Sequence, residues 1–248
     1  MQSREPIFNV PAAVTGTIAI LILVQATFWW LGEADEERLK LQLAFLPIRY
    51  LQPGFGLRGD LPGAAVWSFV SHQFVHGDWT HLAMNSVWLL AFGGAVAQRI
   101  GNVRFVLLGL ASGIAGALLF LAIRWGEPVP MVGASGAVSG LMGGAFRFFF
   151  NHTRMRDFGE PEHDAAMVPR MSLREAFADR RVLTMIAIWV AINFVTAAAG
   201  FLFTSGGGIA WEAHLGGFAF GFLAFAAFDR QRPPTLAMHG SPGRHTLH

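Results

Sequence analysis

Long apolar stretches alternate with polar connections along almost the whole chain. A helix needs about 20 apolar residues to cross the hydrocarbon core of a bilayer, which is roughly 30 Å thick. Apolar stretches near this length indicate helices that lie in lipid or in a deep protein core. The pattern predicts an all-α fold, a polytopic membrane protein built as a bundle of six transmembrane helices. The predicted segments are residues 11–32, 81–98, 103–124, 135–150, 182–203 and 210–228.

The composition supports a protein that lies within the lipid bilayer. Hydrophobic residues make up 53% of the 248 residues and charged residues only 14%, whereas soluble domains carry about 25% charged residues. The net charge of +2 is too small to indicate a nucleic-acid partner. The chain has no cysteine, which excludes disulfides, thiolate metal sites and cysteine nucleophiles. The zinc-protease motif HExxH is also missing, and we predict neither a metal site nor another cofactor.

The ends and connections indicate how the chain lies in the membrane. Residues 11–32 are interpreted as a span and not a signal peptide, because bulky "FWW" stands where a cleavage site needs small residues. Arginines are concentrated in the connections on the side of the N-terminus, which by the positive-inside rule is cytoplasmic. We therefore expect an integral protein of a bacterial inner membrane with both termini in the cytoplasm. The expected parts are residues 1–10 as a cytoplasmic N-terminus, 11–228 as the membrane core and 229–248 as a polar, disordered tail.

The fourth segment is shorter than a full span. Sixteen helical residues reach only about 24 Å, so a helix over 135–150 that ends at the cytoplasmic side begins below the outer surface. The preceding residues include Pro128 and Pro130 and are expected to dip into the protein as a loop. The polar connection 151–181 is interpreted as a solvated loop, with a partner site as the alternative.

Several polar residues lie inside the apolar segments, where they are costly and suggest function. Ser135 opens the fourth segment and His214 lies near the start of the sixth. His81 and Asn85 are four residues apart and share one face of the second helix. Two further residues stand alone, and we interpret them as hydrogen-bonding ties between helices. These are Gln25 and Asn193.

Strips of glycine indicate which helices meet. Small residues at every fourth position allow two helix backbones to approach closely. Such strips begin next to Ser135 and three residues after His214, so facing strips would bring the two side chains together. A serine within about 3 Å of an imidazole is the arrangement of an activated nucleophile. The strips are Gly136, Gly140 and Gly144 on the fourth helix, and Gly217 and Gly221 on the sixth.

The second helix offers partners for an oxyanion. Attack on an amide creates a negative oxygen that needs fixed hydrogen-bond donors. His81 and Asn85 can donate, and so can the backbone N–H of Ser135 at a helix N-terminus. Glu212 is two residues from His214, about 200° around a helix, and should face elsewhere. The residues therefore predict a Ser–His dyad without an acidic third member.

Three of these segments resemble the signatures of rhomboid intramembrane serine proteases. They are "HGDWTHLAMN" at 76–85, "GASG" at 133–136 and "AHLGGFAFG" at 213–221. The combination is specific, and the resemblance extends over residues 11–228. It implies an endopeptidase that cleaves transmembrane proteins at or near the outer membrane face.

The resemblance also implies individual roles. Ser135 is the nucleophile, His214 the general base, and His81 and Asn85 line the oxyanion hole. Gly133 precedes the nucleophile in its loop, and Gly136, Gly217 and Gly221 permit close helix packing. His76 is implied to be structural. Ser139 stands where many relatives have a tyrosine that stacks on the base.

Two other functions fit the same residues less well. A catalytically silent relative could bind transmembrane segments without cutting them, although such relatives usually lack the serine or the histidine. A small transporter or channel could use His81, Asn85 and His214, but three neutral side chains make a poor path for a cation.

Overall fold

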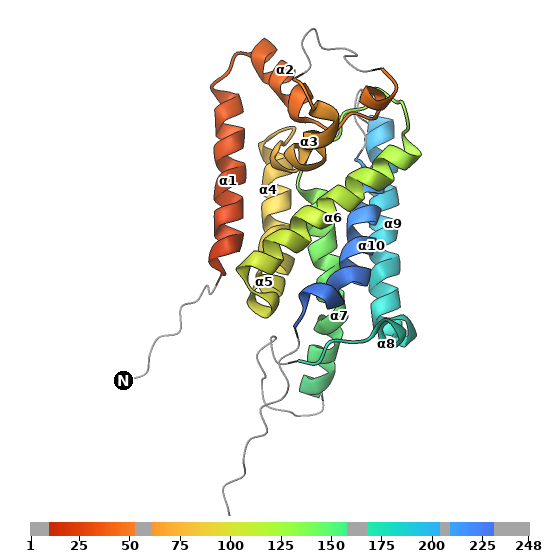
Figure 1. The fold of residues 1–248 in the computed structure, drawn as a ribbon. Helices are drawn as coiled ribbons and strands as arrows, with labels where there is room; N and C mark the ends of the chain where they lie inside the picture. The colour runs from red at the N-terminus through yellow and green to blue at the C-terminus, as the bar shows by residue number, and fades with distance from the viewer. Residues whose placement is uncertain (1–9, 53–60, 158–167, 204–208, 231–248) are drawn as a thin grey trace, which may run out of the picture.

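The computed structural model describes residues 10–52, 61–157, 168–203 and 209–230 (Figure 1). These residues form helices and connecting loops, with one isolated β-bridge between Phe45 and Met131. The predicted all-α class is confirmed. The elements are α1 (Ala12–Trp29), α2 (Glu33–Leu43), η1 (Pro47–Tyr50), α3 (Ala64–Ser71), η2 (His72–Phe74), α4 (Trp79–Trp88), η3 (Leu89–Gly93), α5 (Gly94–Ile100), α6 (Asn102–Ile123), α7 (Ser135–Asp157), α8 (Leu173–Ala178), α9 (Arg180–Phe203) and α10 (Trp211–Phe228).

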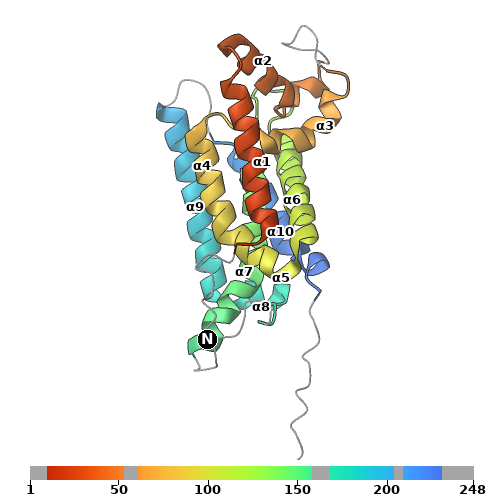
Figure 2. The ribbon, with the colours of Figure 1, turned by 90° about the vertical axis from the view of Figure 1, so that its left-hand side faces the viewer.

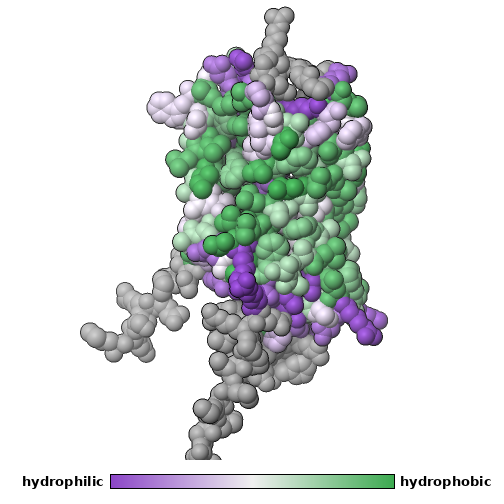
Figure 3. Space-filling model, in the orientation of Figure 1, coloured by the Kyte–Doolittle hydropathy of each residue, from purple (hydrophilic) through white to green (hydrophobic). Residues whose placement is uncertain are grey.

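The chain is an integral membrane protein. Five helical stretches in the described residues are long and apolar enough to cross a bilayer, and each coincides with a predicted segment. One of them, Trp79–Ile100, runs through α4, η3 and α5 as a single span with a π-helical turn. Figure 3 shows an apolar belt around the molecule between two more polar ends. Helix α1 begins, at Ala12, at the same end of the bundle at which α10 ends, at Phe228 (Figure 1).

Helix α7 corresponds to the remaining predicted segment, but the expected length was wrong. It contains 23 residues and ends at Asp157, so at about 1.5 Å per residue it is roughly 35 Å long. The expectation failed because polar residues begin at Asn151, and polarity ends an apolar pattern without ending a helix. The amide of Asn151 donates to the carbonyl of Pro169 at 3.0 Å, which ties this extension to the following loop.

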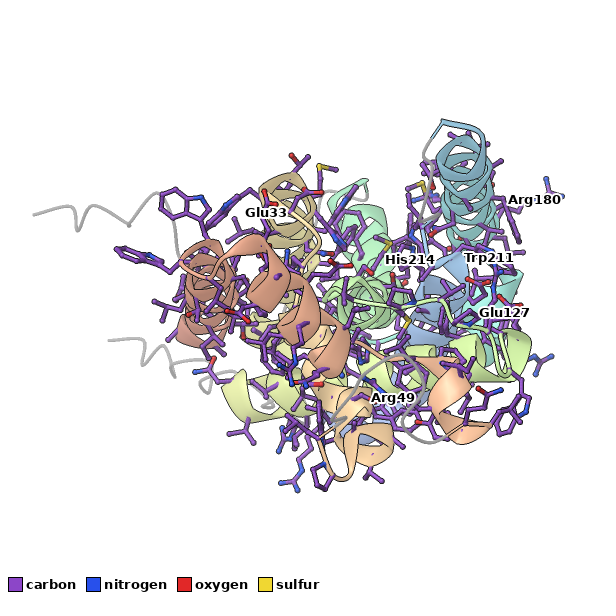
Figure 4. All side chains as sticks on the ribbon, turned by 90° about the horizontal axis from the view of Figure 1, so that it is seen from above. Glu33, Arg49, Glu127, Arg180, Trp211 and His214 are labelled. Carbon is purple, nitrogen blue, oxygen red and sulfur yellow. The ribbon has the colours of Figure 1, made fainter. Side chains whose placement is uncertain are left out.

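The core of the bundle consists of α6, α7 and α10, which pack against one another along their lengths. Glycines make this possible, because the backbone of Gly217 lies against Gly136 and that of Gly221 against Gly140. The glycine strips predicted to face each other therefore do so. Helices α1 and α9 flank this core on opposite sides (Figures 1 and 4), and α1 packs across α4 and α6 (Figure 2).

Short elements cover the end of the bundle where α7 begins. Helices α2 and α3 lie across this end (Figure 1). The bridge between Phe45 and Met131 comprises two backbone hydrogen bonds of 3.0 and 2.9 Å, and Ile48 N–H donates to the Glu127 carbonyl at 3.1 Å. These bonds hold the loop before α7 in place, so the start of α7 is built on a fixed support.

Buried charged side chains hold the helices together at the end of the bundle away from the start of α7. The Arg99 guanidinium contacts the Asp229 carboxylate at 2.9 Å, and both side chains are almost fully buried. Arg147 donates to the carbonyls of Met171 and Phe222, both at 2.7 Å. Two expectations need correction here. Asp229 is part of the packed structure and not of a tail, and residues near Met171 pack against the core although they belong to the connection read as solvated. Residues 231–248 and 1–9 lie outside the described residues.

Candidate active site

The hydroxyl of Ser135 lies next to the imidazole of His214. The distance from Ser135 Oγ to His214 Nε2 is 2.8 Å. Ser135 is the first residue of α7, and His214 lies in the first turn of α10. Because α7 and α10 touch through their glycines, their first turns are close enough for this hydrogen bond. The two side chains therefore lie side by side, as the glycine strips predicted.

Asn193 completes a chain of three side chains. Its Oδ1 lies 2.6 Å from Nδ1 of His214, and its Nδ2 donates to the carbonyl of Trp189 at 2.8 Å. Asn193 does tie two helices, α9 and α10, as expected, but it does not stand alone, because its partner is His214. Nothing in its sequence neighbourhood marks it, since it lies on α9, 21 residues before His214. The available signal was its amide group, which is buried in an otherwise apolar span.

His81 and Asn85 face the loop that leads into α7. Asp78 caps α4 by accepting the backbone N–H of His81 at 2.8 Å. A Cβ atom added to Gly133 would lie 2.8 Å from the His81 ring and 3.6 Å from Asn85 Nδ2. Gly133 also has a φ of +118°, which a side chain would strain. Glycine at this position lets the backbone beside Ser135 approach both polar side chains of α4.

The structure places one buried hydrogen-bond donor without an acceptor beside the loop that leads to Ser135. Asn85 Nδ2 is buried and has no hydrogen-bond partner within the described part of the chain. Ser135 is at the start of a helix, where backbone N–H groups lack intrahelical acceptors. A buried donor without a partner costs roughly 1–3 kcal/mol. Such a group is tolerated where a ligand or reaction intermediate supplies the acceptor.

Two buried histidines hold the loop that precedes α7. Gly133 N–H donates to the His72 carbonyl at 2.9 Å, and Ala134 N–H donates to His76 Nε2 at 3.5 Å. The His76 ring lies edge-on to that of His81, 5.1 Å between centroids. Burial lowers the pKa of both His72 and His76 to about 4. Both rings are therefore neutral near pH 7, as the His76 ring must be if its Nε2 accepts from the Ala134 N–H.

Glu212 binds elsewhere, as predicted. Its carboxylate accepts from Arg124 Nε at 2.6 Å, and the side chain is buried. The pair joins the first turn of α10 to the end of α6. Figure 4, viewed along the bundle from the end that carries α2, shows His214 among the helices between Glu33 on one side and Glu127 on the other.

Access differs between the site residues. Ser135, His214 and His81 are partly exposed, whereas Asn85 and Gly133 are buried. The Ser135 hydroxyl and the His81 ring are therefore partly accessible, while the Asn85 amide is shielded. Among the residues that the structure describes, no three His, Asp or Glu side chains are grouped to hold a metal ion.

Comparisons of the sequence with known proteins match it to one family. The sequence model of the Rhomboid domain matches residues 63–231, which contain all of the site residues described above. The chain is 31% identical to RHOMBOID-like protein 4 of Arabidopsis thaliana over 192 residues, which are 77% of this chain and 41% of that protein.

Bacterial relatives include proteins named as proteases. The chain is 30% identical to Rhomboid protease GluP of Bacillus subtilis over 161 residues, 65% of this chain and 26% of that protein. It is 26% identical to Rhomboid protease GlpG of Yersinia pseudotuberculosis over 161 residues, 64% of this chain and 46% of the relative. The chain thus spans less than half the length of each of these three relatives.

Proposed function

Because this chain belongs to the rhomboid family, we propose that it is an intramembrane serine endopeptidase that uses Ser135 and His214 as a catalytic pair. The observation that carries the proposal is the 2.8 Å hydrogen bond between Ser135 Oγ and His214 Nε2. A nucleophile within hydrogen-bond reach of a base is the required geometry for covalent catalysis. The relatives named as proteases support the same reaction class.

The arrangement suggests a sequence of steps. His214 Nε2 accepts the proton of Ser135, and Oγ attacks the scissile carbonyl of a transmembrane segment. His81, Asn85 and the backbone N–H of Ser135 donate to the resulting oxyanion. His214 then protonates the leaving amine. Water attacks the acyl-enzyme, His214 takes its proton, and Ser135 regains its hydrogen as the acid product leaves.

The position of Ser135 supports cleavage near one membrane surface. It begins α7 at the end covered by α2 and α3, and Ser135 and His214 are both partly exposed. Water can therefore reach the acyl-enzyme.

From the arginine distribution we infer that this end faces outward from a bacterial inner membrane. Single cysteines at Glu37 and Arg174, on α2 and α8, test the inference, since the chain has no cysteine of its own. Only Glu37→Cys should react with an impermeant maleimide in intact cells.

The decisive experiment combines labelling and cleavage. Purified protein in detergent is treated with a fluorophosphonate probe and, separately, with a model transmembrane substrate. We expect wild type to be labelled and to cleave, and Ser135→Ala and His214→Ala to do neither. Label retained in Ser135→Ala would refute the nucleophile. Wild type that binds the substrate without cleaving or labelling would instead favour a catalytically silent binder.

A further inference from the structure

Asn193 extends the pair of Ser135 and His214 to a third side chain. We propose that Asn193 is a positioning residue that fixes the tautomer and orientation of His214, so that the site works as a Ser–His–Asn triad. This inference rests on the proposed protease function and goes beyond the dyad. Its basis is the 2.6 Å contact between Asn193 Oδ1 and His214 Nδ1.

The hydrogen bonds of the Asn193 amide define its direction. Its NH₂ group donates to the Trp189 carbonyl at 2.8 Å, which leaves the oxygen for His214. An amide oxygen can only accept a hydrogen bond. Nδ1 of His214 must therefore carry the proton, and Nε2 of the neutral ring presents its lone pair to the Ser135 hydroxyl. This is the tautomer that a general base needs.

The contact belongs to a short ladder between α9 and α10. Trp189 stacks on Phe218, with ring centroids 4.4 Å apart. Asn193 and His214 each lie one turn away from that pair along their helices, which run in opposite directions. Beyond them the rings of Phe194 and Trp211 lie 4.8 Å apart. The polar bond is thus flanked by aromatic contacts on both sides.

Helix α9 is otherwise sparsely attached. Only 11% of its apolar window is buried within the protein, and Asn193 is one of its few buried residues. The orientation of the base therefore depends on a helix held by this ladder and by Val182 and Ile186, which pack against the core nearer the start of α9. When α9 separates from α10, His214 loses its acceptor and Ser135 loses an oriented base. Catalytic competence is in this way coupled to the docking of α9.

The test compares two replacements that keep the branch at Cγ. Asn193→Leu removes the acceptor and is somewhat larger, and Asn193→Asp keeps an acceptor oxygen. We expect Asn193→Leu to lower kcat by more than tenfold, towards the roughly 10⁴-fold loss seen when a catalytic histidine holds the wrong tautomer, with KM within about twofold. The kcat of Asn193→Asp should be at least tenfold higher than that of Asn193→Leu. Thr184→Val, an exposed polar-to-apolar change on the same helix, should behave as wild type.

A spectroscopic readout separates positioning from packing. The ¹⁵N chemical shifts of histidine side chains report which ring nitrogen carries the proton, and His214→Ala identifies the signal. Wild type should show Nδ1–H for His214, and Asn193→Leu should lose this preference. Wild-type His214 in the Nε2–H form would overturn the inference even if Asn193→Leu does not fold. So would unchanged kcat in Asn193→Leu, or equal losses in the Leu and Asp variants. Failure of wild type to cleave or label would refute the protease and not the hydrogen bond.

Discussion

The backbone of Gly221 lies directly against the carbonyl group of Gly140, and a Cβ at Gly221 would overlap that carbonyl. Gly217 makes the same contact with Gly136 one turn nearer the site. These contacts set the separation of α7 and α10, and that separation sets the distance between Ser135 and His214. The packing of α7 against α10 therefore also determines the geometry of the catalytic pair.

The first prediction concerns this contact. Gly221→Ala should push α10 away from α7, because the obstacle is backbone and cannot rotate aside. Overpacking of this kind lowers the free energy of unfolding by about 1–3 kcal/mol, and we expect cleavage to fall with it as the Ser135–His214 bond lengthens. Thermal unfolding in detergent and substrate cleavage measure both effects.

Gly109→Ala is the matched control for this change. Gly109 lies within α6 and has open space around its Cα. Alanine there should leave activity unchanged and add up to about 1 kcal/mol, since it favours the helix. Equal behaviour of the two alanine variants would contradict the packing argument.

The second prediction addresses the unpartnered amide of Asn85. Asn85→Ala should reduce kcat by about 10²–10³-fold, the usual loss for one oxyanion donor, and leave KM nearly unchanged. Ser86→Ala is the neighbouring control, because the Ser86 hydroxyl donates to the Leu82 carbonyl of its own helix at 2.8 Å and to no other group in the described ranges. A fully active Asn85→Ala enzyme would remove this residue from the oxyanion hole.

A third prediction concerns the buried ion pair at the far end. In Asp229→Asn the Arg99 guanidinium, whose side chain is only 3% exposed, loses its carboxylate. Removal of one partner of a buried pair costs about 3–5 kcal/mol, and thermal unfolding should show a loss of this order. The double variant Arg99→Leu, Asp229→Leu should lose less, because the buried Arg99 charge is removed together with its partner and only the more exposed Arg170, 3.6 Å from Asp229, loses a carboxylate contact. A double variant less stable than Asp229→Asn would speak against this reasoning.

The fourth prediction is the pH dependence of stability. His72 and His76 have pKa values lowered to about 4 by burial, against about 6.5 when unfolded. Between these values the unfolded chain binds more protons than the native one. Stability is therefore full above about pH 6.5 and falls as the pH drops towards 4, by up to about 3 kcal/mol per histidine.

Melting temperatures in detergent at several pH values test this dependence. Asp78 and Lys40, the charged residues beside His76, are not expected to reverse it. His76→Gln should flatten the acid slope. A melting temperature that stays constant or rises below pH 6 would show that the two rings are not buried in their neutral form.

Much of the architecture was predictable from local pattern. Apolar length located the spans, because lipid demands continuous apolar surface and a helix satisfies its own backbone. The spacing of Gly136, Gly140, Gly217 and Gly221 predicted which helices touch, since glycine at every fourth position forms a smooth strip whatever the partner. Ser135, His81 and Asn85 stood out because polar groups are rare in such segments.

The tertiary structure alone decided which distant side chains meet. Asn193 approaches His214 only because α9 packs antiparallel on α10, and the Asp229 carboxylate is paired only because Arg99 and Arg170 come together beside it. The length of α7 likewise depended on contacts of its polar extension, such as that of Asn151 with Pro169. Local pattern records what a segment prefers in water or lipid. A hydrogen bond between helices depends on the position of both, and that position follows from the packing of the whole bundle.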